Sequence, residues 1–368
     1  MASSIADPIP TGQSWARLAG LARRSERILI PAGALLVGLL VFSLFLLLQG
    51  KSPAEFWSLV YKAGFGSTFS WGNTLSRAAP LLLAALCVAL PARLGLIVIG
   101  GEGAVVLGGL AAGAIGAALI GFAPTLTMLG MAFGAFALGA LWIGAVGWLR
   151  HWRGVNETIA SLLMAYIAIA LLNHFVEGPL RDPQSLNKPS TAPIDEAVKV
   201  GVMPWLDVHW GLLAGVIACV LAWILIDFTR FGFAARVAGA NLRAAQVQGL
   251  PTGWLIVCFC ALGGGLAGLA GYFEVSAVHG SANGSLIAGY GYTGILIAFM
   301  AQHHPLAIIP ATILVAGFEA SSGLVQRRMD LPDATVLVMQ GCLFIFILVS
   351  ETLYGRFRLF VPERWQRT

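Results

Sequence analysis

Three glutamates lie within long apolar runs or at their rims, where a carboxylate is costly unless it faces a cavity or a partner. They are Glu102, Glu274 and Glu319. Glu102 has the strongest claim to a function, because its neighbours Gly100, Gly101 and Gly103 would loosen a helix and free backbone groups to line a pathway. The alternative is a packing break in which the carboxylate caps the helix as it resumes at Ala104. We expect Glu274 and Glu319, close to the outer ends of their runs, to be simply exposed.

No catalytic or metal-binding constellation accompanies these carboxylates. Residues 289–294 match the GxGxxG pattern of dinucleotide sites, but they stand in an apolar, glycine-rich segment without a flanking strand. The five cysteines fall in apolar runs at spacings that metal sites do not use. His303 and His304 face apart if helical and have no carboxylate beside them, so we interpret them as solvated turn residues. We therefore predict no catalytic residue, no metal and no cofactor bound by this chain.

The elements that must position the glutamates are membrane spans. The chain is 58% hydrophobic and only 11% charged, against about 25% charged residues in an average soluble domain. Its 45 glycines suit helices that pack closely through small side chains. The apolar runs are too long for the strands of a barrel. This composition predicts an all-α polytopic membrane protein with about ten transmembrane helices.

The spans can be placed from the apolar runs. They cover residues 28–48, 74–90, 94–120, 125–149, 158–176, 211–226, 254–275, 295–301, 306–320 and 335–350, and the alternative start of the eighth span is near Leu286. The glycines around Glu102 interrupt the third run, and residues 280–294 form either a loop or a re-entrant element. With both termini in the cytoplasm, the basic residues lie in excess on the inner side, as the positive-inside rule requires.

These spans imply a simple domain organisation. A cytoplasmic segment, residues 1–27, precedes a transmembrane domain of residues 28–351 and a cytoplasmic basic tail of residues 352–368. Residues 177–208 form a proline-containing external loop. Residues 228–252 form a cytoplasmic loop that carries Arg230, Arg236 and Arg243 and, from Thr229 to Pro251, no acidic residue. This polar, helix-prone island between two spans predicts a docking surface for a cytoplasmic partner.

Several of these segments, taken in order, resemble one family. They are Gly100-Gly101-Glu102-Gly103, Gly154-Val155-Asn156-Glu157-Thr158-Ile159, Gly178-Pro179-Leu180-Arg181-Asp182-Pro183, Gly239-Ala240-Asn241-Leu242-Arg243-Ala244-Ala245, and Gly289-Tyr290-Gly291-Tyr292-Thr293-Gly294-Ile295 with His304-Pro305-Leu306. The chain resembles, from about Thr74 to Ser350, permease subunits of ATP-binding-cassette importers for ribose-type sugars and, more closely, nucleosides. The family commonly has Asn and Gln where this chain has Val98 and Ala104. If that pair contacts ligand, the substrate preference has shifted.

The resemblance implies a type II importer in a bacterial inner membrane. Two permease subunits, identical or homologous, would form the pore, above cytoplasmic ATP-binding subunits and below a periplasmic or lipoprotein substrate-binding protein; no nucleic acid is involved. The ATPase-coupling residues would be Arg236, Gly239, Ala240, Asn241, Ala244, Ala245 and Gly249. The substrate pathway would use Gly100, Glu102, Gly103, Asn156, Glu157, Tyr166, Glu274, Tyr290 and Tyr292. A bulky residue at Gly239, or Asn241→Asp, should abolish transport without preventing membrane insertion.

The rival interpretation is an ion-coupled secondary transporter or channel that works without an ATPase. It requires buried charge pairs along the pathway. The sequence offers only scattered carboxylates with no Lys or Arg at membrane depth, which favours the importer.

Overall fold

The protein is built from helices, as its composition predicts. The computed structural model describes residues 12–185, 188–204 and 206–352, with side chains from residue 29 onward. Within that part of the chain there are only two isolated β-bridges and no named strand. Nine of the described helices are long and apolar enough to cross a membrane, and one further apolar helix is shorter.

The helices follow the predicted spans closely. They are α1 (Gly12–Leu48), α2 (Pro53–Gly64), α3 (Thr68–Ala92), α4 (Gly101–Ala118), α5 (Pro124–Arg153), α6 (Glu157–Glu177), α7 (Gly211–Phe228), α8 (Arg230–Ala240), α9 (Leu242–Val247), α10 (Thr252–Phe273), α11 (Tyr290–Met300), α12 (Pro305–Met329) and α13 (Ala334–Glu351). In the described part of the loop after α6 the helical structure is one short 3-10 turn, Glu196–Val198, which agrees with the many prolines of this loop.

The chain divides into two compact units. The smaller unit combines residues 1–53 with 337–368, and so pairs α1 with most of α13. Gly38 lets these two helices meet, because a Cβ there would lie 2.9 Å from Leu343 Cδ2. The larger unit, residues 54–336, contains every residue that the sequence proposes for the site.

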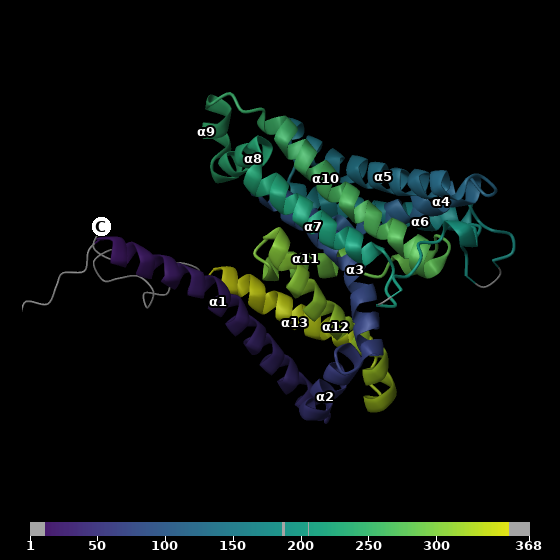
Figure 1. Cartoon of the computed structure of the whole chain (residues 1–368), viewed down its shortest axis with the longest axis horizontal. Helices are drawn as coiled ribbons and strands as arrows, with labels where there is room; N and C mark the ends of the chain where they lie inside the picture. The colour runs from purple at the N-terminus through teal and green to yellow at the C-terminus, as the bar shows by residue number, and fades with distance from the viewer. Residues whose placement is uncertain (1–11, 186–187, 205, 353–368) are drawn as a thin grey trace, which may run out of the picture. The chain divides into compact units, whose positions relative to one another are not determined.

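In the larger unit, α10 packs along α5, α3 and α4 (Figure 1). Glycines make this packing close: a Cβ at Gly264 would overlap the Gly139 carbonyl, and one at Gly268 would overlap the Ala135 carbonyl. Gly264 and Gly268, four residues apart on α10, thus let its backbone approach α5 closely. The helices α8 and α9 follow α7 and precede α10 at one end of this unit (Figure 1), so the polar island is helical.

Two interruptions of the helices distinguish the larger unit. Residues 93–100 between α3 and α4 are not helical, so the third run is broken as predicted, although the break begins before the glycines. After α10 the backbone continues as a π-helix, Glu274–His279, and a 3-10 turn, Gly284–Leu286. α11 then begins at Tyr290, between the two expected starts at Leu286 and Ile295, and its 11 residues span about 16 Å, roughly half of a bilayer core.

Candidate functional site

Glu102 binds the beginning of α11. Its carboxylate is fully buried and accepts hydrogen bonds from two backbone amides, Gly289 to Oε1 at 2.8 Å and Gly291 to Oε2 at 2.7 Å. Both amides belong to the group that a helix leaves unpaired at its N-terminus, where the helix dipole also favours an anion. The expected alternative, a cap on its own helix at Ala104, is therefore wrong, because the carboxylate caps a different helix.

The glycines around Glu102 allow backbones to approach. A Cβ at Gly100 would overlap the Ser161 carbonyl of α6, and a Cβ at Gly103 would lie 2.9 Å from Ala165 Cα. A Cβ at Gly291 would overlap the backbone nitrogen of Glu102. Packing therefore requires glycine at Gly100 and Gly103 whether or not they also line a pathway.

Side chains of α6 form hydrogen bonds with backbone groups in the break between α3 and α4. Thr158 donates its hydroxyl to the Ile97 carbonyl at 2.9 Å, and the Ile99 amide donates to the Ser161 hydroxyl at 3.0 Å. These two side chains thus bind two of the backbone groups that a continuous helix would have paired.

Asn156 and Glu157 hold the start of α6. The Asn156 side chain caps the helix by accepting from the Thr158 and Ile159 amides. Glu157 forms an ion pair with Arg150 at 3.2 Å. They lie about 14 Å along α6 from Tyr166, by the helical rise per residue. Their observed contacts are local, and their proposed role in the pathway remains a prediction.

Three carboxylates converge on the first turn of α11. Beside Glu102, Glu274 pairs with the Tyr290 side chain, and Glu319 accepts from the Thr293 hydroxyl at 3.1 Å. The sequence interpretation had these acids scattered, and it expected Glu274 to be exposed. That expectation is wrong, because Glu274 is only 3% exposed and also contacts His279 at 3.4 Å.

Arg77 supplies a positive charge to the same neighbourhood. It lies within the α3 span and close enough to Tyr290 to act on it electrostatically, together with Glu274 and Glu319. Arg77 is exposed and lies in the polar first part of α3, which begins Thr68-Phe69-Ser70.

Two tyrosines border this cluster. Tyr166 on α6 is 59% exposed and Tyr292 on α11 is 39% exposed. They lie within electrostatic reach of one another, and Tyr292 also of Glu102. Exposed aromatic rings beside carboxylates suit a ligand with a ring and hydroxyl groups. The structure thus brings five of the predicted pathway residues together: Glu102, Tyr166, Glu274, Tyr290 and Tyr292.

The island is built to present α9. Asn241 accepts from the Ala244 amide at 3.0 Å and so caps α9, and Gly249, at φ +78°, makes the turn toward α10. Ala245 is fully buried, whereas Ala240 and Ala244 are exposed.

The preceding helix, α8, is tied to its surroundings. Arg236 forms an ion pair with Asp227 at 3.3 Å. Gly239 lies against the end of α3, since a Cβ there would overlap the Arg93 carbonyl. The island is therefore fixed on one side and open on the side that α9 presents.

Comparison with known proteins decides the family. Residues 70–348 match the family described as the permease component of branched-chain amino acid transport systems. The chain belongs to this permease family. It is 30% identical, over 89% of both chains, to a glucose ABC transporter permease of Haloferax volcanii. It is 28% identical, over 90% of this chain and 96% of the relative, to a guanosine ABC transporter permease of Bacillus subtilis. A probable riboflavin import permease of Treponema pallidum is 24% identical over 88% and 85%.

The protein is thus a multi-pass membrane permease of an ATP-binding-cassette importer, and not itself a catalytic enzyme. Membership implies association with an ATPase and a substrate-binding protein. Val98 and Ala104, the positions at which the resemblance leads to an expectation of Asn and Gln, are both fully buried. In this structure neither side chain reaches a surface where a ligand could touch it.

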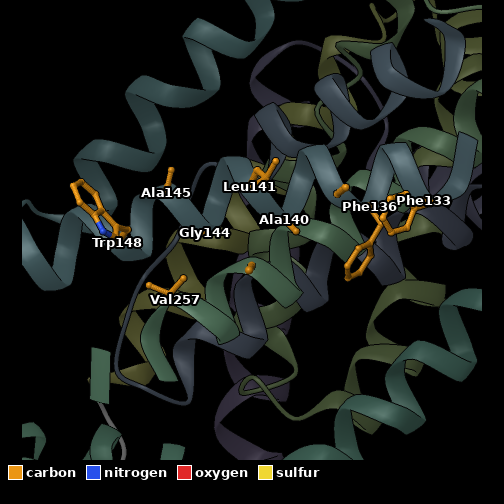
Figure 2. A pocket seen from close by; sticks show the side chains of 10 residues that line it. Phe133, Phe136, Ala140, Leu141, Gly144, Ala145, Trp148 and Val257 are labelled. Atoms are coloured by element: carbon orange, nitrogen blue, oxygen red, sulfur yellow. The ribbon is translucent and has the colours of Figure 1, made fainter. Parts of the chain in front are cut away.

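An apolar groove between α5 and α10 is a poor candidate for the ligand site of the permease. It encloses about 570 Å³ and runs along α5 from Phe133 and Phe136 to Trp148 (Figure 2). Apart from the Trp148 indole, its lining side chains have no hydrogen-bonding group. A hydroxylated ligand would lose its hydrogen bonds to water there without replacement. The polar cluster at α11 is the better candidate.

Sequence reasoning missed one contact near α11, that of Arg93. Its guanidinium Nη2 donates to the His303 carbonyl at 2.9 Å, in the turn that follows α11. The only sequence signal was a basic residue directly after a span, which topology alone already explains.

Proposed function

We propose that this permease imports a nucleoside into the cytoplasm of a bacterial cell, across the inner membrane. A second permease subunit, identical or homologous, completes the pore. A periplasmic or lipoprotein substrate-binding protein delivers the ligand, and a cytoplasmic subunit binds and hydrolyses ATP.

The observation that carries the energetic part of the proposal is the exposed surface of α9. Leu242 is 40% exposed and Val247 is 86% exposed, on a short helix capped at Asn241. Apolar side chains displayed on a structured polar loop are typical of a protein interaction surface. The ATPase would bind here, through the residues from Arg236 to Gly249.

The chain itself supplies no obvious site for ATP. Gly50-Lys51-Ser52 has the end of a phosphate-binding loop, but Phe45 stands where the motif requires a glycine. ATP therefore binds the partner subunit, and the permease needs no cofactor of its own.

The polar cluster at α11 supports a nucleoside as the substrate. Tyr166 and Tyr292 have exposed rings on which a base can stack. Stacking on aromatic side chains does not depend on which base is bound. The carboxylate of Glu274 lies nearby and would accept hydrogen bonds from ribose hydroxyls in a pathway that opens during transport, while Glu102 holds the first turn of α11, which carries Tyr292. Relatives that carry guanosine and nucleosides agree with this choice.

A simple sugar is the second candidate, because one relative at 30% identity carries glucose. Competition experiments separate the two. Uptake of labelled guanosine by the reconstituted complex should be inhibited by unlabelled nucleosides and not by excess glucose. Inhibition by glucose or ribose alone would contradict the nucleoside assignment and support the sugar.

The same assay tests the stacking residues. Tyr292→Leu should lower uptake about tenfold, since base stacking on an aromatic residue contributes about 1–3 kcal/mol, while Tyr292→Phe should retain most of it. Equal uptake by both variants would remove Tyr292 from the pathway.

A further inference from the structure

One segment holds α11 at both of its ends. We call residues 93–102, which connect α3 to α4, the bracket. At its start, Arg93 donates to the His303 carbonyl just beyond the C-terminus of α11, and at its end, Glu102 accepts from the amides of Gly289 and Gly291. The bracket has enough length, since ten residues reach about 30 Å and α11 is about 16 Å long.

The two charges suit the helix they hold. A carboxylate at a helix N-terminus and a guanidinium at its C-terminus both interact favourably with the helix dipole. Glu102 is fully buried, and Arg93 is half-buried, so water screens these interactions less than it would on the surface. α11 is therefore bound to the bracket more firmly than by packing alone.

The bracket also touches the island. The Arg93 carbonyl lies against Gly239 of α8, so closely that a Cβ at Gly239 would overlap it. Gly95 faces the Gly239 carbonyl from the other side, since a Cβ there would lie 3.7 Å away. A displacement of α8 toward the end of α3 must displace the start of the bracket, because close-packed backbones cannot pass through each other.

Arg93 has a hydrogen-bond donor that could bind a partner in a second conformation of the protein. Its Nε is buried and has no hydrogen-bond partner among the described residues. Asp227 lies within electrostatic reach of Arg93 but pairs with Arg236 in this structure. An unpaired buried donor is destabilising, and a shift of Asp227 from Arg236 to Arg93 would give this donor a partner.

From these contacts we propose that Arg93 is the positioning residue that couples the docking island to α11. Movement of α8 under the ATPase shifts Asp227 and the start of the bracket, and α11, held at both ends, moves with it. The first turn of α11 carries Tyr290 and Tyr292, so the movement reaches the polar cluster. This inference rests on the proposed docking of an ATPase at α8 and α9.

Replacement of Arg93 tests the link. In the reconstituted complex, Arg93→Gln should still bind the ATPase and hydrolyse ATP, but it should transport about tenfold less substrate for each ATP hydrolysed, within the usual size of coupling effects. Arg93→Lys, which can still donate to the His303 carbonyl, should recover part of the loss. The matched control is Arg153→Gln, at an exposed arginine that ends α5, which should behave as the wild type.

Several outcomes would overturn the inference. Transport by Arg93→Gln at the wild-type ratio would show that the link is not needed, and loss of ATPase binding would show that Arg93 acts in docking instead. Absence of ATP-driven uptake in the wild-type complex would be a different result, since it would contradict the proposed function as well.

A second measurement uses the wild-type chain and so does not depend on whether the variants fold. Hydrogen exchange of the amides of Gly289 and Gly291, which Glu102 holds, should change about tenfold when ATP and vanadate trap the ATPase in its closed state. Unchanged exchange there, with altered exchange in α8 and α9, would overturn the inference.

Discussion

The contact between Glu102 and Gly291 depends on both residues. The Glu102 carboxylate accepts hydrogen bonds from two backbone amides at the start of α11. It reaches them only because Gly291 has no side chain that would overlap the Glu102 backbone. Hydrogen bonds to an ionised acceptor are stronger than neutral ones, and burial strengthens them further.

A methyl group at Gly291 should break this contact. Gly291→Ala should destabilise the permease by about 2–3 kcal/mol, because overpacking forces backbone shifts, and it should reduce uptake. Gly284→Ala is the control, since Gly284 lies in the same connection with no atom near its Cβ position. Thermal unfolding in nanodiscs measures both, and equal unfolding temperatures would contradict the contact.

His303 makes stability depend on pH. Burial, and then the neighbouring Arg93 charge, lower the pKa of His303 from 6.5 to about 4. The folded protein therefore keeps this histidine neutral while the unfolded chain binds a proton, so its contribution is complete above pH 6.5 and is lost as the pH falls toward 4.

The wild type should consequently lose on the order of 1 kcal/mol more unfolding free energy than His303→Gln between about pH 7.5 and 5, after allowance for partial exposure. His304→Gln, at the exposed neighbouring histidine, should keep the wild-type pH dependence. Denaturation in detergent at a series of pH values checks this, and parallel curves for wild type and His303→Gln would refute it.

At the scale of elements, the sequence predicted the island better than it predicted α11. Charge and position identified residues 229–251 as a helix-prone loop, and α8 and α9 occupy it. The start of α11 at Tyr290 could not be read from the sequence, because a glycine-rich apolar run fits a loop or a helix equally well. The deciding contacts come from Glu102, which is 187 residues away from Gly289 in the chain.

A substitution at the cap of α9 can change the charge of its surface without unfolding the helix. Aspartate caps a helix as well as asparagine does, so Asn241→Asp should leave α9 folded. The added negative charge should nevertheless weaken ATPase binding and abolish transport, because the docking surface is otherwise free of acidic residues.

Co-purification of the ATPase with the permease, together with uptake, measures this effect. Asn73→Asp, at an exposed asparagine near the opposite end of α3, is the matched control. Wild-type binding and uptake by Asn241→Asp would exclude α9 from the interface.

At the scale of the whole molecule, hydropathy was sufficient for the class and for most helix bounds. α5, α6 and α7 each begin within a residue of the expected position. The candidate site was predictable only in part: Glu102, Tyr290 and Tyr292 were identified from the sequence, whereas nothing in the sequence indicated that Arg77 lies near Tyr290 or that Arg93 binds the His303 carbonyl. Their roles depend on which helices meet, and no local pattern encodes that.

The energy source of transport tests the central claim most directly. The permease, its ATPase and its binding protein would be reconstituted in liposomes with labelled guanosine on the side of the binding protein. We predict uptake only when ATP is present on the side of α8 and α9, and no uptake by the permease alone under a proton or sodium gradient. Accumulation of guanosine by the permease alone, driven by an ion gradient without ATP, would contradict the account.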